Sequence, residues 1–447
     1  MKFINWPEFS VRARGAVALF AAAGLAAGCG GTSGTVTKTT TGTGTNSGSN
    51  VLPITVDGGP EVNAPNGYIY ENAAFATATV CAPGSTTSCV TIDHLLVDTG
   101  SVGLRVFQTE VASLNLPGLS ASNGAAAYDC VNFVDGSYLW GPVEKADVSL
   151  GGETASSTPI QVISSATTGI PTSCSNGSSD NQNTAVLLGA NGILGVGTEP
   201  TDCYIDGGSP CDPSSGLVNP PYPAYYSCSG DTCSSAFVSV ADQVTNPVAL
   251  FATDNNGVIV ELPSASASEA SLSGSLVFGI GTENNNGLPS SASVFTLVCG
   301  EFATSFDGRN FGITDANTCA GQGSFIDSGS NGLFFPNVPN LPACPSNTSV
   351  GNLSAFYCPS ATESLSATME GEDGSSKLVS FNVANAEDLF TSASTSSDAV
   401  QPGLAGGSPG GVGFDWGLPF FYGVNLYSAI DGQAVPAGAP PAPWWAY

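Results

Sequence analysis

The chain contains one eight-residue stretch twice, as Val97-Asp98-Thr99-Gly100-Ser101-Val102-Gly103-Leu104 and again as Ile326-Asp327-Ser328-Gly329-Ser330-Asn331-Gly332-Leu333. An apolar run precedes each copy, so a strand is expected to deliver an Asp onto a glycine turn in each half of the chain. Two carboxylates presented in the same way by two related halves predict a hydrolytic site built on Asp98 and Asp327.

A second element follows each turn at a similar distance. Gly192-Ile193-Leu194-Gly195 ends 97 residues after Asp98, and Phe414-Asp415-Trp416-Gly417 ends 90 residues after Asp327. A glycine at the end of such an element lets a strand pass closely behind a loop, because glycine has no Cβ. The two halves therefore share the same order of elements.

The composition excludes several classes of protein. His94 is the only histidine, which argues against zinc hydrolase chemistry and against Ser-His-Asp or Cys-His catalysis. Its place in an apolar strand favours a structural role. Acidic residues outnumber basic ones 36 to 8, so no basic patch is available for nucleic acid. We expect no metal and no organic cofactor.

The N-terminus has the pattern of a processing signal. Basic residues precede an apolar run from 15 to 27, which is too short to span a bilayer. The run ends in Leu25-Ala26-Ala27-Gly28-Cys29, which resembles a bacterial lipobox. Residues 1–28 are thus expected to be a lipoprotein signal peptide, with a lipid on Cys29 that anchors the protein to a membrane. An ordinary secretory signal is the alternative.

Residues 29–50 are rich in Gly, Ser and Thr and predict a flexible tether, with ends about 25 Å apart. Gly30 follows the cysteine and no Asp is present there, a pattern typical of outer-membrane lipoproteins. The expected location is the bacterial cell envelope, anchored at the outer membrane. A secreted or periplasmic protein is the alternative.

Without Cys29, twelve of the thirteen cysteines remain, an even number that suits an oxidising compartment. The simplest framework pairs sequence neighbours, although the sequence leaves the connectivity open. The pairs would be Cys81/Cys89, Cys130/Cys174, Cys203/Cys211, Cys228/Cys233, Cys299/Cys319 and Cys344/Cys358.

The rest of the chain indicates strands. Alternating apolar runs predict strands at 75–80, 90–97, 146–150, 258–262 and 274–278, and short helical windows occur only near 236–244 and 384–389. We expect an N-terminal lobe at 51–245 and a C-terminal lobe at 246–447. Two insertions, 198–235 and 391–412, are interpreted as surface loops.

With these motifs the chain resembles the pepsin-like aspartic peptidases. It also resembles a bacterial envelope family of unknown function that carries the same motifs. The resemblance rests on the two Asp turns and on the elements around Gly195 and Gly417, and it extends over most of 65–430. It implies an all-β, bilobal double-lobe fold with a central cleft and few short helices, a monomer, and a polypeptide substrate.

The resemblance also implies a role for each residue of the turns. Asp98 and Asp327 would be the catalytic pair, and Thr99 and Ser328 would link the two turns through their hydroxyls. The backbones of Gly100 and Gly329 would bond the inner carboxylate oxygens, and the hydroxyls of Ser101 and Ser330 the outer ones. Two such carboxylates share a proton, and no cofactor is needed.

The chain departs from the family pattern at the flap over the cleft. Phe133 falls nearest the position of the flap Tyr, with Tyr138 as a shifted substitute. Arg105 occupies the position of a Trp that supports the flap, and a cation there would stabilise ionised Asp98. Two functions follow: an aspartic endopeptidase, or a catalytically weak pepsin-like envelope protein that acts in peptide or protein binding or adhesion.

Overall fold

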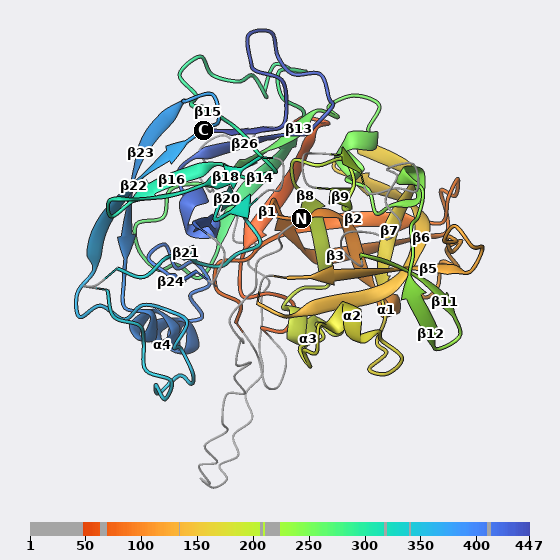
Figure 1. Cartoon of the computed structure of the whole chain (residues 1–447), viewed down its shortest axis with the longest axis horizontal. Coiled ribbons are helices and arrows are strands. Elements are labelled where there is room, and N and C mark those ends of the chain that lie inside the picture. The colour runs from red at the N-terminus through yellow and green to blue at the C-terminus, as the bar shows by residue number, and fades with distance from the viewer. Residues whose placement is uncertain are drawn as a thin grey trace, which may run out of the picture.

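The computed structural model describes residues 48–62, 69–133, 135–205, 209–210, 224–316, 320–338, 341–408 and 413–447. The fold is all-β with few short helices, and its two lobes lie side by side in Figure 1. The expected signal peptide (1–28), the expected lipidation site Cys29 and most of the expected tether (29–50) lie outside the described residues. Within the described part, no helix has the length and apolarity needed to cross a membrane.

Ten of the strands in the first half join the large sheet of the protein. These are β1 (Val51–Val56), β2 (Ala74–Cys81), β3 (Cys89–Asp98), β4 (Val102–Phe107), β5 (Ala126–Asn132), β6 (Tyr138–Leu150), β7 (Glu153–Ile163), β8 (Gly192–Val196), β11 (Tyr225–Ser229) and β12 (Thr232–Ser235). Pairing of β6 with both β7 and β2 closes six of them, in the order β2-β3-β8-β4-β7-β6, into a barrel. β1 pairs with β14 of the second half, so the sheet continues from one lobe into the other.

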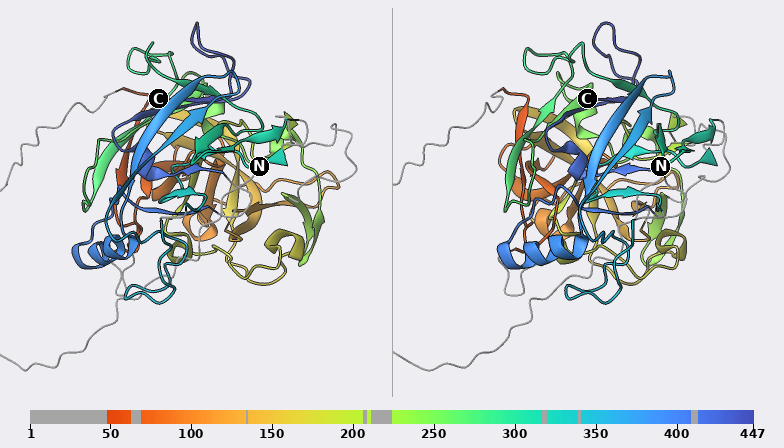
Figure 2. Two further views of the ribbon diagram at one scale, coloured as in Figure 1. Left: turned by 60° about the vertical axis from the view of Figure 1, so that its left-hand side comes forward. Right: turned by 90° about the vertical axis from the view of Figure 1, so that its left-hand side faces the viewer.

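The second half contributes the rest of the large sheet, two four-stranded sheets and the two-stranded sheet β18-β19. Its strands are β13 (Gly257–Glu261), β14 (Leu272–Phe278), β15 (Val294–Thr296), β16 (Ala303–Phe306), β17 (Arg309–Phe311), β18 (Ile313–Asp315), β19 (Ala320–Gly321), β20 (Phe325–Ile326), β21 (Leu333–Phe335), β22 (Glu363–Glu370), β23 (Ser376–Val383), β24 (Ala405–Gly407), β25 (Asp415–Trp416), β26 (Asn425–Ala429) and β27 (Trp444–Ala446). In the right-hand view of Figure 2 the β22–β23 hairpin faces the viewer, with the helix α4 (Ala386–Ser396) below it. All five predicted strands are present, as β2, β3, the end of β6, β13 and β14.

The remaining elements are short. They are β9 (Tyr204–Ile205), β10 (Ser209–Pro210), α1 (Gln108–Val111), α2 (Thr172–Ser175), α3 (Ala185–Leu188), and the 3-10 helices η2 (Val240–Asp242), η3 (Pro247–Leu250) and η4 (Leu418–Phe421). Asn385 starts α4 by accepting hydrogen bonds from the N–H groups of Glu387 and Asp388. The helical window near 384–389 is therefore confirmed, while the window near 236–244 contains only η2.

The duplicated motifs form the same four-stranded unit twice. In the first half the order is β3-β8-β4-β7, and in the second it is β20-β25-β21-β24. The first strand of each unit enters the Asp turn and runs parallel to the second, and the third leaves the turn antiparallel to the second. Gly195 is the last but one residue of β8, and Gly417 directly follows β25. A Cβ on Gly195 would stand 2.6 Å from the backbone N of Val102, and one on Gly417 would stand 2.1 Å from the carbonyl oxygen of Gly332.

Four disulfides match the predicted neighbour pairs: Cys81–Cys89, Cys130–Cys174, Cys228–Cys233 and Cys344–Cys358. Cys203 and Cys299 are also disulfide-bonded. Their expected partners, Cys211 and Cys319, lie outside the described residues.

The interpretation of the two insertions as surface loops was wrong for much of their described length. The first forms β11 and β12, and β11 pairs with β5 at the edge of the barrel sheet. Tyr225 and Tyr226 are 2% and 0% exposed there. The second insertion contains β24, which completes the four-stranded unit around Asp327. Ser-, Gly- and Pro-rich composition misled the sequence interpretation, because such segments also supply short strands in tight packing.

Candidate active site

Asp98 is the last residue of β3 and is fixed by its own turn. The backbone N–H of Gly100 donates to Asp98 Oδ1 at 2.9 Å, and the Ser101 hydroxyl donates to Oδ2. The chain then continues into β4. Both oxygens of this carboxyl therefore have fixed donors from the three residues that follow it.

Asp327 stands at the end of β20 in an equivalent turn. The backbone N–H of Gly329 donates to Asp327 Oδ1 at 2.7 Å, and the Ser330 hydroxyl donates to Oδ2 at 3.0 Å. The backbone N–H of Asp327 itself donates to the carbonyl oxygen of Trp416 on β25 at 3.1 Å. The two turns thus hold their carboxyls with the same pair of donors.

The structure brings the two turns together so closely that each Asp lies over the glycine of the other. A Cβ on Gly100 would stand 2.5 Å from Cγ of Asp327, and a Cβ on Gly329 would stand 2.7 Å from Oδ1 of Asp98. Any larger residue at either glycine would collide with the opposite carboxyl. Glycine is therefore required by contact between the turns.

The carboxyls lie in a buried environment. Asp98 is 6% exposed and Asp327 is 8% exposed. Burial raises the pKa of the Asp327 carboxyl well above its ordinary value, and the charge of Asp98 and a hydrogen bond to it raise this pKa further. The bonds from Ser330 and Gly329 act in the opposite direction. Asp327 consequently holds a proton under conditions in which an exposed Asp is ionised.

A pocket of about 60 Å³ opens beside Asp327. Residues from both halves line it: Thr99, Gly100, Thr198, Glu199, Cys299, Gly300, Glu301, Phe325, Asp327 and Trp445. One member of the Asp pair therefore borders a space between the lobes.

Neither flap candidate lines this pocket. Phe133 is half-buried and packs against the cluster that contains Val131 and Leu139. Tyr138 is 5% exposed and packs against the Cys130–Cys174 disulfide. The hairpin between β5 and β6 is present, with a bond from the N–H of Phe133 to the carbonyl oxygen of Ser137 at 3.0 Å, but both rings pack inside the N-terminal half.

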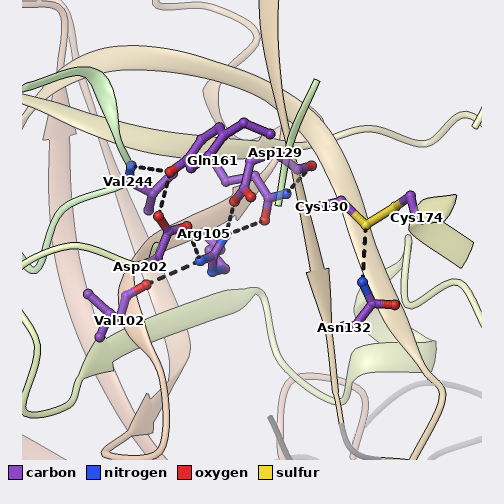
Figure 3. A network of polar contacts seen from close by, with 10 residues as sticks. Val102, Arg105, Asp129, Cys130, Asn132, Gln161, Cys174, Asp202 and Val244 are labelled. Carbon is purple, nitrogen blue, oxygen red and sulfur yellow. Dashed lines mark hydrogen bonds and ion pairs between the residues drawn. A yellow bond between two sulfur atoms is a disulfide. The ribbon is translucent and has the colours of Figure 1, made fainter. Parts of the chain in front are cut away.

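Arg105 is fully buried, and its charge is taken up by residues other than Asp98. Its guanidinium donates to Asp129, to Asp202 Oδ2 at 2.8 Å and to Gln161 Oε1 at 2.8 Å, as Figure 3 shows. The Tyr225 hydroxyl donates to the second oxygen of Asp202. We expected this cation to stabilise ionised Asp98, and the structure corrects that expectation. Arg105 instead ties β4, β5 and the first insertion together.

One guanidinium faces two carboxyls in this network, and burial raises the pKa of both. Burial, together with the charge of Asp202, raises the pKa of Asp129 to about 8. Arg105 acts in the opposite direction on the same carboxyl. The two Asp residues lie 24 and 97 positions from Arg105, and no local pattern marks either of them.

Sequence reasoning also missed a third carboxyl beside the pair, Asp415 on β25. It is 0% exposed, and burial raises its pKa well above the ordinary value, with further contributions from the charges of Asp327 and Asp98. The available signal was a charged residue inside an otherwise apolar element, Phe414-Asp415-Trp416-Gly417.

Residues 46–447 match the model of a family described as protein of unknown function (DUF3443). No curated protein matches the chain. Among solved structures, the aspartic proteinase from Irpex lacteus is similar at 16% identity and a TM-score of 0.41. That match covers 84% of this chain and 93% of the proteinase.

Proposed function

We propose that this chain, which belongs to the DUF3443 family of proteins of unknown function, is an aspartic endopeptidase acting on polypeptides. The observation that carries the proposal is the pair of interlocked turns, in which two buried carboxyls contact each other and each has the same donors. Such a pair supplies a base and an acid at one place, which is what the addition of water to a peptide carbonyl requires.

The protonation of the pair assigns the roles. Asp98 acts as the base and takes a proton from a water, whose oxygen then bonds to the carbonyl carbon of the substrate. Asp327, whose raised pKa keeps it protonated, gives its proton to the carbonyl oxygen. When the carbon–nitrogen bond of the resulting diol breaks, the leaving nitrogen receives a proton from Asp98. The proton lost by the second hydroxyl returns to Asp327, so the pair ends as it began.

The test is cleavage of casein and of a quenched fluorescent peptide library between pH 3 and pH 7. We expect the wild type to cleave, and Asp98→Asn and Asp327→Asn each to abolish cleavage while the protein stays folded. Asp93→Asn is the matched control, because Asp93 is an exposed carboxyl on the same strand as Asp98. Retained cleavage in either site variant would remove the pair from the mechanism.

The positions of the two flap residues favour a second function, peptide binding without cleavage. Because Phe133 and Tyr138 pack inside the N-terminal half and do not line the pocket, the site lacks an aromatic cover contributed by them. Such a protein would bind peptides without cleaving them. Peptide binding that is equally strong in the wild type and in Asp327→Asn, with no cleavage in either, would support this alternative.

We also propose that the mature protein begins at a lipid-modified Cys29, is anchored at the outer membrane and acts as a monomer. The lipobox-like sequence before Cys29 supports the anchor. Mass spectrometry of the N-terminal peptide, with Cys29→Ser as the control, tests it. A processed N-terminus without lipid would place the protein in the periplasm or outside the cell.

A further inference from the structure

The pocket beside Asp327 has a composition that the proposed reaction does not explain. Three carboxyl side chains line it, those of Asp327, Glu199 and Glu301, and only the first belongs to the Asp pair. None of the described residues that line the pocket is basic. The two glutamates come from opposite halves of the chain, so both halves contribute to the negative charge of the pocket.

Glu199 reaches the pocket from a segment that passes behind the Asp98 turn. This segment continues directly from β8, and the N–H of Gly197 donates to the carbonyl oxygen of Ser101 at 2.9 Å. A Cβ on Gly197 would stand 2.8 Å from the same oxygen. The side chain of Asn246 donates to the carbonyl oxygen of Gly197 at 3.0 Å. Glu199 therefore follows closely on a fixed point of the backbone.

Glu301 reaches the pocket from a tight turn in the C-terminal half. The backbones of Val298 and Glu301 form two hydrogen bonds with each other, at 2.8 and 2.9 Å. Between them Cys299 and Gly300 have φ values of 55° and 76°, as in a two-residue hairpin turn. A Cβ on Gly323 would stand 2.0 Å from Glu301 Oε2. The carboxyl of Glu301 thus lies over the segment that leads into β20.

The two glutamates meet at the tip of this turn. A Cβ on Gly300, the residue before Glu301, would stand 3.0 Å from Glu199 Oε1. Glu301 is 8% exposed and Glu199 is half-buried. Burial raises the pKa of the Glu199 carboxyl, and the charge of Asp431 raises it further. A cation that enters the pocket would offset both effects, whereas an anion would add repulsion.

The rest of the lining suits the stem of a basic side chain. Phe325 and Trp445 add aromatic surface to the same pocket. Lys and Arg side chains combine an apolar stem with a charged end, and a pocket of aromatic rings and carboxyls matches both parts. Its volume of about 60 Å³ has room for about four to six water-sized groups. The lysine side chain has five non-hydrogen atoms and that of arginine seven, so lysine fits better.

The indole of Trp445 is a second indication of a ligand. Trp445 is 2% exposed and borders the pocket. Its N–H has no hydrogen-bond partner in the described part of the chain, whereas the N–H of Trp444 donates to the carbonyl oxygen of Pro440 at 3.0 Å. Buried donors normally have a partner. A carbonyl oxygen of a bound peptide is an acceptor that would provide one.

We propose that this pocket is the subsite for a basic side chain of the substrate, lysine above all, and that Glu199 and Glu301 determine this preference. Because Asp327 and Gly100 also line the pocket, the basic residue is one of the two that flank the cleaved bond. Trp445 donates to a carbonyl oxygen of the same peptide. The inference rests on the proposed function, which makes the bound molecule a polypeptide.

The kinetic test uses peptides that differ only in one residue next to the cleaved bond, which is lysine, norleucine or glutamate. Norleucine keeps the stem of lysine and removes the charge. We expect the full chain to cleave the lysine peptide with a kcat/KM about tenfold above that of the norleucine peptide, and the glutamate peptide least. Glu199→Gln and Glu301→Gln should each remove most of this preference and leave the norleucine peptide unchanged. Glu363→Gln, at an exposed position at the start of β22, is the matched control.

A binding measurement does not require turnover. In the Asp327→Asn background, fluorescence anisotropy of labelled lysine and norleucine peptides gives their dissociation constants. Glu199→Gln should weaken binding of the lysine peptide alone. Trp445→Phe should weaken both peptides by the same factor, about threefold to tenfold, because the lost hydrogen bond goes to the peptide backbone. A Trp445→Phe variant that binds both peptides with undiminished affinity would remove the indole from the subsite.

The two measurements separate the inference from the proposed function. If the wild type cleaves neither peptide but binds the lysine peptide more tightly, and Glu199→Gln abolishes the difference, the proposed function fails and the subsite stands. If the wild type cleaves the lysine and norleucine peptides equally well, the proposed function stands and the inference is overturned. A preference for lysine that survives in both Glu199→Gln and Glu301→Gln would overturn it as well.

Discussion

Thr99 and Ser328, 229 positions apart in the sequence, form two hydrogen bonds with each other. The N–H of Thr99 donates to the Ser328 hydroxyl at 3.1 Å, and the N–H of Ser328 donates to the Thr99 hydroxyl at 2.9 Å. Each hydroxyl then donates to a carbonyl oxygen of the opposite strand, Ile326 or Val97. The two Asp turns are therefore held as one rigid piece by four bonds between the halves of the molecule.

This link predicts the effect of Thr99→Val. The valine keeps the shape but leaves the N–H of Ser328 and the carbonyl oxygen of Ile326 without their partner, which should cost about 1–3 kcal/mol of unfolding free energy. The proposed peptidase activity should fall as well, because the carboxyls lose their fixed separation. Denaturant titration and kcat are the measurements. Thr99→Ser keeps the hydroxyl and is the control, and a Thr99→Ser variant as impaired as Thr99→Val would contradict the explanation.

Replacing Arg105 by Met tests the buried network. The change leaves Asp129 and Asp202 buried without their cation, and we expect a loss of about 3–5 kcal/mol in the free energy of unfolding. Arg309→Met is the matched control, because Arg309 is half-exposed and lies 4.0 Å from Asp307. Surface pairs of that kind contribute at most about 1 kcal/mol. Equal losses in the two variants, measured by denaturant titration, would refute the structural role of the network.

Local motifs made part of this molecule predictable. The Asp turns and the glycines at 195 and 417 are each encoded in a few consecutive residues, because a tight turn and a close approach limit which residues fit. The alternation of apolar residues that predicted β2, β3, β13 and β14 is likewise visible within a few consecutive residues. These features determined the all-β fold and brought Asp98 and Asp327 forward as candidates.

Features that depend on distant partners were not predictable. Arg105 was expected to act on Asp98 because it occupies the position of a Trp that supports the flap in the pepsin-like family. In the structure it is paired instead with Asp129 on β5 and with Asp202 in the first insertion. The burial of Tyr225 depends on the pairing of β11 with β5, which no local pattern specifies. Asp415 stood inside a recognised element, but only the register of β25 against β20 shows that it lies behind Asp327.

The lengths of the loops that two disulfides close predict which of them stabilises the protein more. Cys130 and Cys174 are 44 positions apart, and Cys228 and Cys233 are 5 apart. Loop closure in the unfolded chain predicts a loss of about 4 kcal/mol for replacing the first pair by Ala and about 2 kcal/mol for the second. Urea titration of the two double variants measures this difference. A larger loss for the Cys228–Cys233 pair would show that packing around the sulfurs, and not chain entropy, dominates.

The buried acids predict that the protein is more stable in mild acid than at neutral pH. Asp327, Asp415 and Asp129 have pKa values above their ordinary value of about 3.9 in the folded state, so the folded protein binds more protons than the unfolded chain above about pH 4. Their contribution to stability is therefore fully present below about pH 4 and is lost as the pH rises toward their folded values. The formal net charge of −28 at pH 7 adds repulsion in the same direction.

Thermal melting of the wild type between pH 4 and pH 8 checks this prediction, with Asp415→Asn as the diagnostic variant. The amide cannot ionise, so this variant should gain stability relative to the wild type as the pH rises, and its melting temperature should depend less on pH. Asp231→Asn removes the same formal charge from the exposed turn between β11 and β12, and we expect it to leave the pH dependence almost unchanged. A wild type that melts at a lower temperature at pH 4.5 than at pH 7.5 would mean that carboxylates whose pKa is lowered in the folded state, such as Asp373, outweigh the buried protonated acids.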